Sequence, residues 1–134
     1  MPCHPNIQDN EILYRAIPPT PNFWKDTGKP SSAAFKDSKG TSVDREFYRT
    51  ESRCCDFLLE RKTGYGVVSV VSEQCREFGT YPVGMYAENN PFHAEIHDSE
   101  HEVQITQSKA RKIAASADVL RTTQINTNSF TEHS

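Results

Sequence analysis

The sequence lacks the features that would place a protein in a membrane, outside the cell or on nucleic acid. No apolar run approaches the ~20 residues that a membrane-spanning helix requires. The first residues, MPCHPNIQDN, contain no basic start and no apolar stretch, so a secretory signal is not expected. The formal net charge of −3 creates no long-range attraction to nucleic acid or to an anionic membrane. We therefore expect a cytoplasmic protein for which membrane and nucleic acid are disfavoured partners.

Cysteine is scarce and poorly spaced for a disulfide framework. The chain has 4 cysteines in 134 residues, and Cys54 and Cys55 are adjacent, so we expect free thiols in a reducing compartment. The length suits one domain. Both ends are polar, and the first residues also contain proline. We expect a flexible arm over residues 1–10, a single domain over 11–120 and a flexible tail over 121–134.

Hydrophobic periodicity predicts the elements of this domain. Apolar or β-branched runs predict strands at 11–17, 31–36, 65–71 and 92–97, and four prolines with a glycine predict a loop at 18–30. Helical spacing predicts helices over 42–64 and 107–120, with Ser42 or Thr41 capping the first and Ser108 the second. Residues 72–79 fit a short helix or a continuation of the preceding strand. This order predicts an α+β fold, with two or three helices packed on one side of a small mixed or antiparallel sheet.

The stretch FHAEIHDSEH, residues 92–101, concentrates candidate metal ligands, with histidines at positions 93, 97 and 101. Its HAE triplet matches half of the zinc nucleobase-deaminase signature, but no cysteine follows His93 to supply the other half. On a strand, His93, Glu95 and His97 would share one face and could hold a metal. The simpler interpretation is the polar face of an edge strand, with Ala94 and Ile96 towards the core. We adopt it and predict no metal site, while a single functional histidine at position 93 stays open.

A second group of polar residues predicts an anion site. Arg15 lies in the apolar run LYRAI, and a guanidinium there needs an acid, carbonyl oxygens or a ligand anion. An internal salt bridge to Asp44 or Glu46 is the structural alternative. Lys109 opens the last predicted helix, where a cation opposes the helix dipole unless an anion binds there. The alternative for this lysine is that it points to solvent.

The series LYRAI, KPSSAAFKDSKGTSV, FHAEIH and KARKIA resembles a family of short, uncharacterised bacterial proteins. They share an R-x-I strand, a PSS-x-AF segment, a glycine turn leading into SV, an HA strand and a C-terminal basic helix. The resemblance covers about residues 11–120 and implies positions, with no activity attached. It implies structural roles for Pro30, Phe35, Val43 and Ala94, and a polar pocket at Arg15, Ser31, Ser32, Ser42 and His93.

A second resemblance concerns ADP-ribosyltransferases of the Arg–Ser–Glu type. LYR, SSAAF and HAE follow one another in the order of that family's motifs. The resemblance implies that Arg15 holds the phosphates of NAD, that Ser31 orients it and that Glu95 stabilises charge developing on the ribose. The chain departs from the family in its short arginine-to-serine gap and in having no paired E-x-E or Q-x-E at Glu95.

Two function hypotheses follow from these observations. The first is a non-catalytic binding or accessory module that takes an anionic small molecule, or a protein partner. Its anion-accepting pocket would contain Arg15, Ser31, Ser32, Ser42, His93 and Lys109. The second is an enzyme acting on a nucleotide or another phosphorylated ligand, such as an ADP-ribosyltransferase-like protein using Arg15, Ser31 and Glu95. The sequence identifies no cofactor.

Overall fold

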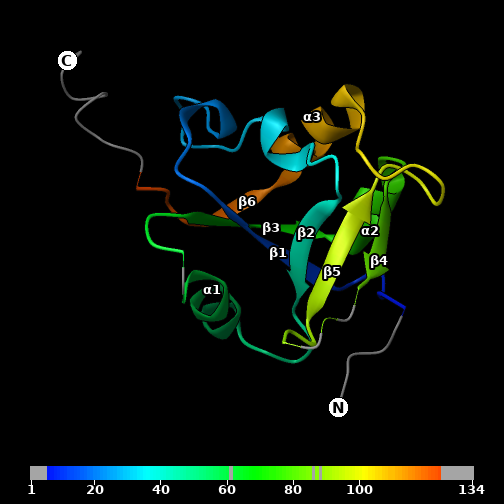
Figure 1. Ribbon diagram of the computed structural model, residues 1–134, viewed down its shortest axis with the longest axis horizontal. Coiled ribbons are helices and arrows are strands. Elements are labelled where there is room, and N and C mark those ends of the chain that lie inside the picture. The colour runs from blue at the N-terminus through cyan, green and yellow to red at the C-terminus, as the bar shows by residue number, and fades with distance from the viewer. Residues whose placement is uncertain (1–5, 61, 86, 88, 125–134) are drawn as a thin grey trace.

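A six-stranded antiparallel sheet forms the centre of the protein (Figure 1). The computed structural model describes residues 6–60, 62–85, 87 and 89–124. Within them the strand order is β4-β5-β2-β1-β3-β6. The strands are β1 (Ile12–Ile17), β2 (Thr41–Arg45), β3 (Gly66–Val71), β4 (Tyr81–Gly84), β5 (His93–His97) and β6 (Asp118–Arg121). The α+β fold class predicted from the sequence is confirmed.

Helices cover both faces of this sheet. On one face, α3 (Gln107–Ser116) contributes Ala110, Ile113 and Ala114 to the main core, which also contains Leu13 and Val68. On the other face, α1 (Glu51–Leu59) places Cys54 and Cys55 against Tyr14 and Val67. Because neighbouring residues of a strand point to opposite faces, Leu13 and Tyr14 assign the two cores to opposite sides. The expectation that the helices gather on one side is therefore wrong.

The predicted helix over 42–64 is two elements. Residues 41–45 form strand β2, with Thr41 and Val43 buried, and α1 begins only at Glu51. The cap is Thr50, whose Oγ1 accepts from the N–H of Arg53 at 3.2 Å, so neither Ser42 nor Thr41 caps a helix. Between strand and helix, Phe47 and Tyr48 both have positive φ, 38° and 63°. That turn breaks the helical spacing that predicted one helix over 42–64.

Three other segments differ from the prediction. The predicted strand at 31–36 is a 3-10 helix, η2 (Ser32–Phe35), whose Ala34 and Phe35 are buried. The last helix ends at Ser116, because Ala117 takes an extended conformation (φ −69°, ψ 140°) and β6 follows it. Thr106, rather than Ser108, occupies the N-cap position. A further short 3-10 helix, η1 (Pro21–Phe23), lies in the predicted loop.

The remaining predicted elements are present. Strands β1, β3 and β5 lie within the predicted ranges, and α2 (Ser72–Glu77) is the short helix considered for residues 72–79. Within residues 1–10, where we expect a flexible arm, Ile7 belongs to the main core. Ile7 is 4% exposed, and its carbonyl accepts from Arg76 at 2.6 Å. Residues 1–5 and 125–134, including Cys3, lie outside the described residues. Among those that are described, no helix is long and apolar enough to cross a bilayer.

Candidate functional site

The sheet opens beside Arg15. β1 pairs with β3 along six residues but with β2 only at Leu13–Arg45 and Tyr14–Asp44, so β1 and β2 separate after Tyr14. The Arg15 side chain lies at this opening. Its Nε donates to the carbonyl of Ala34 at 2.8 Å and its Nη1 to the carbonyl of Ser42 at 2.7 Å. The guanidinium thus links η2 to β2 where the two strands no longer pair.

Arg15 is only partly compensated there. The predicted internal salt bridge to Asp44 or Glu46 is wrong, because the groups that accept its hydrogen bonds are carbonyl oxygens. Burial lowers the pKa of Arg15 to about 10, and the negative charge of Asp37 opposes this shift. Carbonyl dipoles therefore stabilise the cation less than water would. Its Nη2 has no hydrogen-bond partner among the residues that the structure describes.

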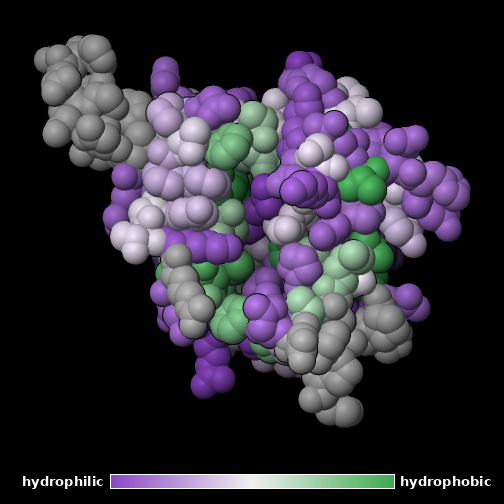
Figure 2. All heavy atoms as spheres, viewed as in Figure 1, coloured by the Kyte–Doolittle hydropathy of each residue, from purple (hydrophilic) through white to green (hydrophobic). Residues whose placement is uncertain are grey.

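A cavity of about 630 Å³ adjoins this guanidinium. Strands β1 and β2 and the start of β5 form one side of the cavity. The C-terminal part of α1 and residues 60, 62 and 65, which follow it, form the other. Figure 2 shows this face hollowed between the part containing α1 and the part containing β2 and β5, with hydrophilic side chains along the hollow. The lining includes apolar and aromatic side chains, at Ala16, Pro18, Val43, Phe57, Leu58 and Tyr65, and polar ones, at Arg15, Asp37, Ser42, Asp44, Glu60, Lys62, Asn89, Asn90 and His93. A volume of this order suits a small molecule.

Asp44 is the most buried charged group of this wall. It is 2% exposed and pairs directly with His93 across β2 and β5. Its Oδ1 accepts from Asn90 Nδ2 at 2.9 Å. Its Oδ2 is buried and has no hydrogen-bond partner in the described part of the chain. A buried carboxylate oxygen without a donor costs about 1–3 kcal/mol, so a ligand that supplies one gains affinity.

The structure brings three of the six residues predicted for the pocket to one cavity: Arg15, Ser42 and His93. Ser31 and Ser32 have partners elsewhere. The Ser31 hydroxyl donates to the carbonyl of Asn22 at 2.6 Å, and Ser32 Oγ accepts from Gln107 Nε2 at 2.9 Å. The second contact joins η2 to α3, so these serines hold the segment that carries the carbonyl of Ala34.

Lys109 also lies outside the cavity lining. Its Nζ donates to the carbonyl of Gly79 at 3.0 Å and to Asp98, at 3.0 Å to the carbonyl and 3.3 Å to Oδ2. Burial would raise the pKa of Asp98, but the N–H of Thr106 and the ammonium of Lys109 hold it below its ordinary value. The sequence offered two interpretations of Lys109, a contact with a bound anion and exposure to solvent. Neither is correct, because its ammonium group binds the internal carboxylate of Asp98.

The alternation predicted for the histidine stretch is present, but the expectation of an edge strand is wrong, because β5 pairs with both β2 and β4. Ala94 and Ile96 are each 0% exposed, while the side chains of the alternate residues of β5 lie on the other face. Glu95 lies between two histidines, with Oε1 at 2.7 Å from His97 Nε2 and Oε2 at 3.7 Å from His93 Nε2. In the described ranges, no three His, Cys, Asp or Glu side chains are grouped so that they could hold a metal ion.

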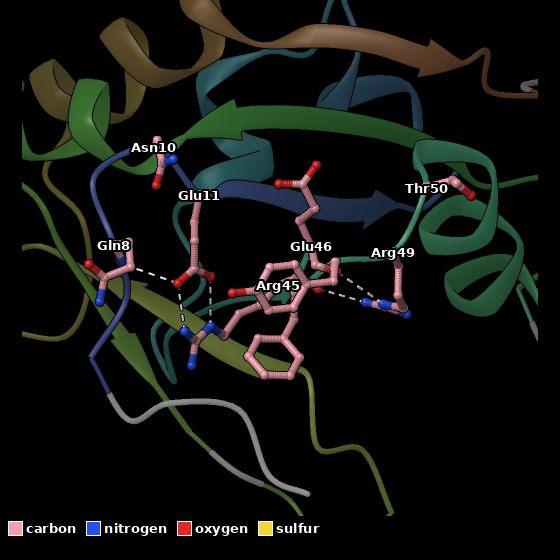
Figure 3. Close-up of a pocket in the computed structure, with 9 residues that line it drawn as sticks. Gln8, Asn10, Glu11, Arg45, Glu46, Arg49 and Thr50 are labelled. Carbon is pink, nitrogen blue, oxygen red and sulfur yellow. Dashed lines mark hydrogen bonds and ion pairs between the residues drawn. The ribbon is translucent and has the colours of Figure 1, made fainter.

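A second cavity of about 580 Å³ lies at the opposite end of β2 (Figure 3). Its lining includes Gln8, Glu11, Arg45 and the turn with Tyr48, whose side chain is 97% exposed. Arg45 and Glu11 bind each other in its floor. Because these charges already neutralise each other, this cavity presents less unsatisfied polar chemistry than the one beside Arg15.

Sequence reasoning missed the residues that complete the wall around Arg15. Asp44 was considered only as an internal partner of Arg15, and Asn90, Lys62 and Tyr65 were not considered. Neighbouring residues of the strand TSVDR point to opposite faces of the sheet. Since Thr41, Val43 and Arg45 lie on one face, Ser42 and Asp44 lie together on the other, and this alternation was the signal in the sequence. No protein-family model matches this chain, and no curated protein and no solved structure matches it.

Proposed function

We propose that the protein is a binding module that takes a small anionic molecule in the cavity beside Arg15. A single observation carries the proposal: the partly buried guanidinium of Arg15 borders the cavity, while its hydrogen bonds to the described residues go to two carbonyl oxygens. An anionic oxygen at this position would give Arg15 a negatively charged hydrogen-bond acceptor in addition to the two carbonyl oxygens.

Several properties of the cavity support a small-molecule ligand. Its walls combine aromatic and aliphatic side chains with a few polar groups, which is typical of such sites. Lys62 adds a second cation to the lining, and Ser42 and Asn90 add neutral polar groups. The carboxylate of Asp37 competes for Arg15 electrostatically. A ligand would therefore need groups that complement the carboxylate of Asp37 as well as the guanidinium of Arg15.

A thermal-shift screen tests the proposal, with phosphate, pyrophosphate, di- and tricarboxylates, nucleotides and NAD as probes. A probe present at 100 times its Kd should raise the free energy of unfolding by about 2.7 kcal/mol. Arg15→Lys keeps the charge but loses the planar donor fork, so we expect binding of the best probe to weaken at least ~10-fold. Arg53→Lys, on the exposed surface of α1, is the matched control. No shift with any anion would contradict the proposal.

NMR spectra of the wild-type protein can show where a probe binds, so this test needs no variant. In wild-type protein, the side-chain Nε–H of Arg15 and the backbone N–H groups of Ser42 and Asp37 should shift in ¹H–¹⁵N spectra when the probe binds. Shifts confined to the turn at Tyr48 would instead place the probe in the other cavity.

A second candidate function is an enzyme acting on a nucleotide or another phosphorylated ligand. The observation in its favour is His93, which lines the cavity with Glu95 Oε2 3.7 Å from its Nε2, and a histidine in a cleft can act in acid–base catalysis. In the ADP-ribosyltransferase-like version, Glu95→Gln would abolish release of nicotinamide from NAD. Binding of NAD without turnover would favour the binding module.

We also propose that the protein works in the cytoplasm and that membrane and nucleic acid are not its partners. The three described cysteines, Cys54, Cys55 and Cys75, are buried free thiols, which suits a reducing compartment. A protein partner remains the alternative to the small molecule, and silence across the whole probe panel would favour it.

A further inference from the structure

The cavity beside Arg15 carries charges of both signs. Arg15 and Lys62 are its cations, whereas Asp37, Asp44 and Glu60 supply three carboxylates. A ligand with only negative charge would gain at Arg15 and be repelled by the carboxylates. A ligand with an additional positive group would meet attraction at both ends.

Asp44 is the carboxylate that most needs such a group. Asp37 accepts from the backbone N–H of Lys39 at 2.8 Å, and Glu60 lies on the exposed surface. Asp44 is buried, accepts one hydrogen bond from Asn90, and keeps Oδ2 without a donor in the described part of the chain. Asn90 belongs to the same wall. A charged donor from the ligand can take the place of the neutral amide and satisfy the carboxylate more strongly.

From these contacts we infer that the ligand is a small zwitterion, with an anionic carboxylate or phosphate bound at Arg15 and an ammonium bound at Asp44. This inference rests on the proposed function and narrows its ligand class. Val43 separates the backbone positions of Ser42 and Asp44 on β2, and the carbonyl of Ser42 is already bound to Arg15. Both charged groups therefore border the same short stretch of β2 and line the same cavity. Phe57, Leu58 and Tyr65 leave an apolar wall for the rest of it.

Matched probe sets test the charge requirement on wild-type protein. The panel contains the free amino acids and O-phosphoethanolamine, each with the analogue that lacks the amine and the analogue that lacks the acid. Titration calorimetry should find at least one zwitterion that binds ~10-fold or more tightly than both of its analogues. Because this comparison uses wild-type protein only, it does not depend on whether a variant folds.

Asp44→Asn tests the assignment of the ammonium. It keeps the size of the side chain and removes its charge, so the zwitterion should fall to the affinity of its amine-free analogue. Asp56→Asn changes an exposed carboxylate of α1 outside the cavity lining and should leave both affinities unchanged.

Each outcome separates this inference from the proposed function. If an amine-free acid binds as tightly as its zwitterion, the inference is overturned and the anion-binding function stands. If no acid or zwitterion binds, or if the amines bind without their acids, the proposed function is overturned as well. A preference for the zwitterion that survives Asp44→Asn would overturn the assignment of the ammonium to this residue.

Discussion

Arg45 binds both carboxylate oxygens of Glu11 in the floor of the second cavity, at 2.8 Å from Nε and 2.6 Å from Nη2 (Figure 3). The two side chains are 3% and 12% exposed. Glu11 is next to the start of β1 and Arg45 ends β2, so this pair closes the sheet at the end opposite to the opening beside Arg15. One end of the β1–β2 interface is thus neutralised internally, and the other exposes a cation to a cavity.

Glu11→Gln should destabilise the protein strongly. The substitution removes the carboxylate charge that Arg45 binds through two hydrogen bonds, and breaking a buried pair in this way costs about 3–5 kcal/mol. We expect a loss of about 3 kcal/mol in the free energy of unfolding, measured by urea denaturation at pH 7. Glu77→Gln, at an exposed position, should stay within about 0.5 kcal/mol of wild type. If Glu11→Gln and Glu77→Gln both have equally small effects, the pair of Glu11 and Arg45 makes no net contribution to the free energy of unfolding.

The contribution of Glu11 should disappear in acid. Burial alone would raise the pKa of Glu11, but hydrogen bonds from Arg45 and the N–H of Gln8 hold it below its ordinary value of 4.5. A lowered folded-state pKa means stability that is present above the unfolded pKa and lost as the pH falls through the folded one. The gap in unfolding free energy between wild type and Glu11→Gln should therefore be constant from pH 7 to 5 and shrink below pH 4.5. A gap that widens on acidification would contradict this sign.

The sequence predicted correctly those elements whose structure follows from their own hydrophobic pattern. GVVSVV is β-branched and HAEIH alternates, so β3 and β5 were evident from the sequence. The segment 42–64 was misread because Cys54, Cys55, Leu58 and Leu59 are truly helical and Phe47 has compatible spacing by chance. The alternation of buried Thr41 and Val43 was the competing signal, and pairing with β1 and β5 decided in its favour.

The candidate site was predictable only in part. An arginine in an apolar strand indicates a special environment, and this reasoning correctly singled out Arg15. The wall that faces it depends on the register of β2 against β5, which places Asp44 opposite His93. Such long-range register leaves no local pattern. Lys109 was misinterpreted for the same reason, because its partner Asp98 comes from the loop after β5.

The turn at Phe47 and Tyr48 should become more stable when glycine replaces Tyr48. A bulky residue with positive φ is strained by about 1–2 kcal/mol, and Tyr48, at φ 63° and 97% exposed, buries almost nothing in return. Glycine relieves the strain but gains entropy in the unfolded state, so Tyr48→Gly should raise the free energy of unfolding by about 0.5–1 kcal/mol. Thermal and urea denaturation would measure the change.

Tyr48→Ala is the matched control, because it removes the ring and keeps a Cβ at the same positive φ. It should bring no stabilisation. If alanine stabilises as much as glycine, then the ring itself, and not the backbone conformation, is the unfavourable element. If both substitutions destabilise, the ring contact between Phe47 and Tyr48, with centroids 5.2 Å apart, contributes more than the strain costs.

Gly40→Ala should perturb the Glu95–His97 pair beside the cavity. Gly40 has φ 110°, and a Cβ there would collide with the carboxylate of Glu95, which is held at 2.7 Å from His97. The substitution should cost about 1–2 kcal/mol for the backbone conformation, and about 1 kcal/mol more for displacing the hydrogen-bonded carboxylate. Gly28→Ala is the matched control, because Gly28 also has positive φ, 88°, but an added Cβ meets open space. In a Glu95→Ala background, the cost of Gly40→Ala should approach that of Gly28→Ala, since the collision with the carboxylate is gone and the remaining close atom, His97 Nε2 at 3.3 Å, belongs to a side chain that can shift. An equal cost of Gly40→Ala with and without Glu95 would mean that the carboxylate moves away freely, and that its contact with His97 is too weak to position either side chain for a ligand.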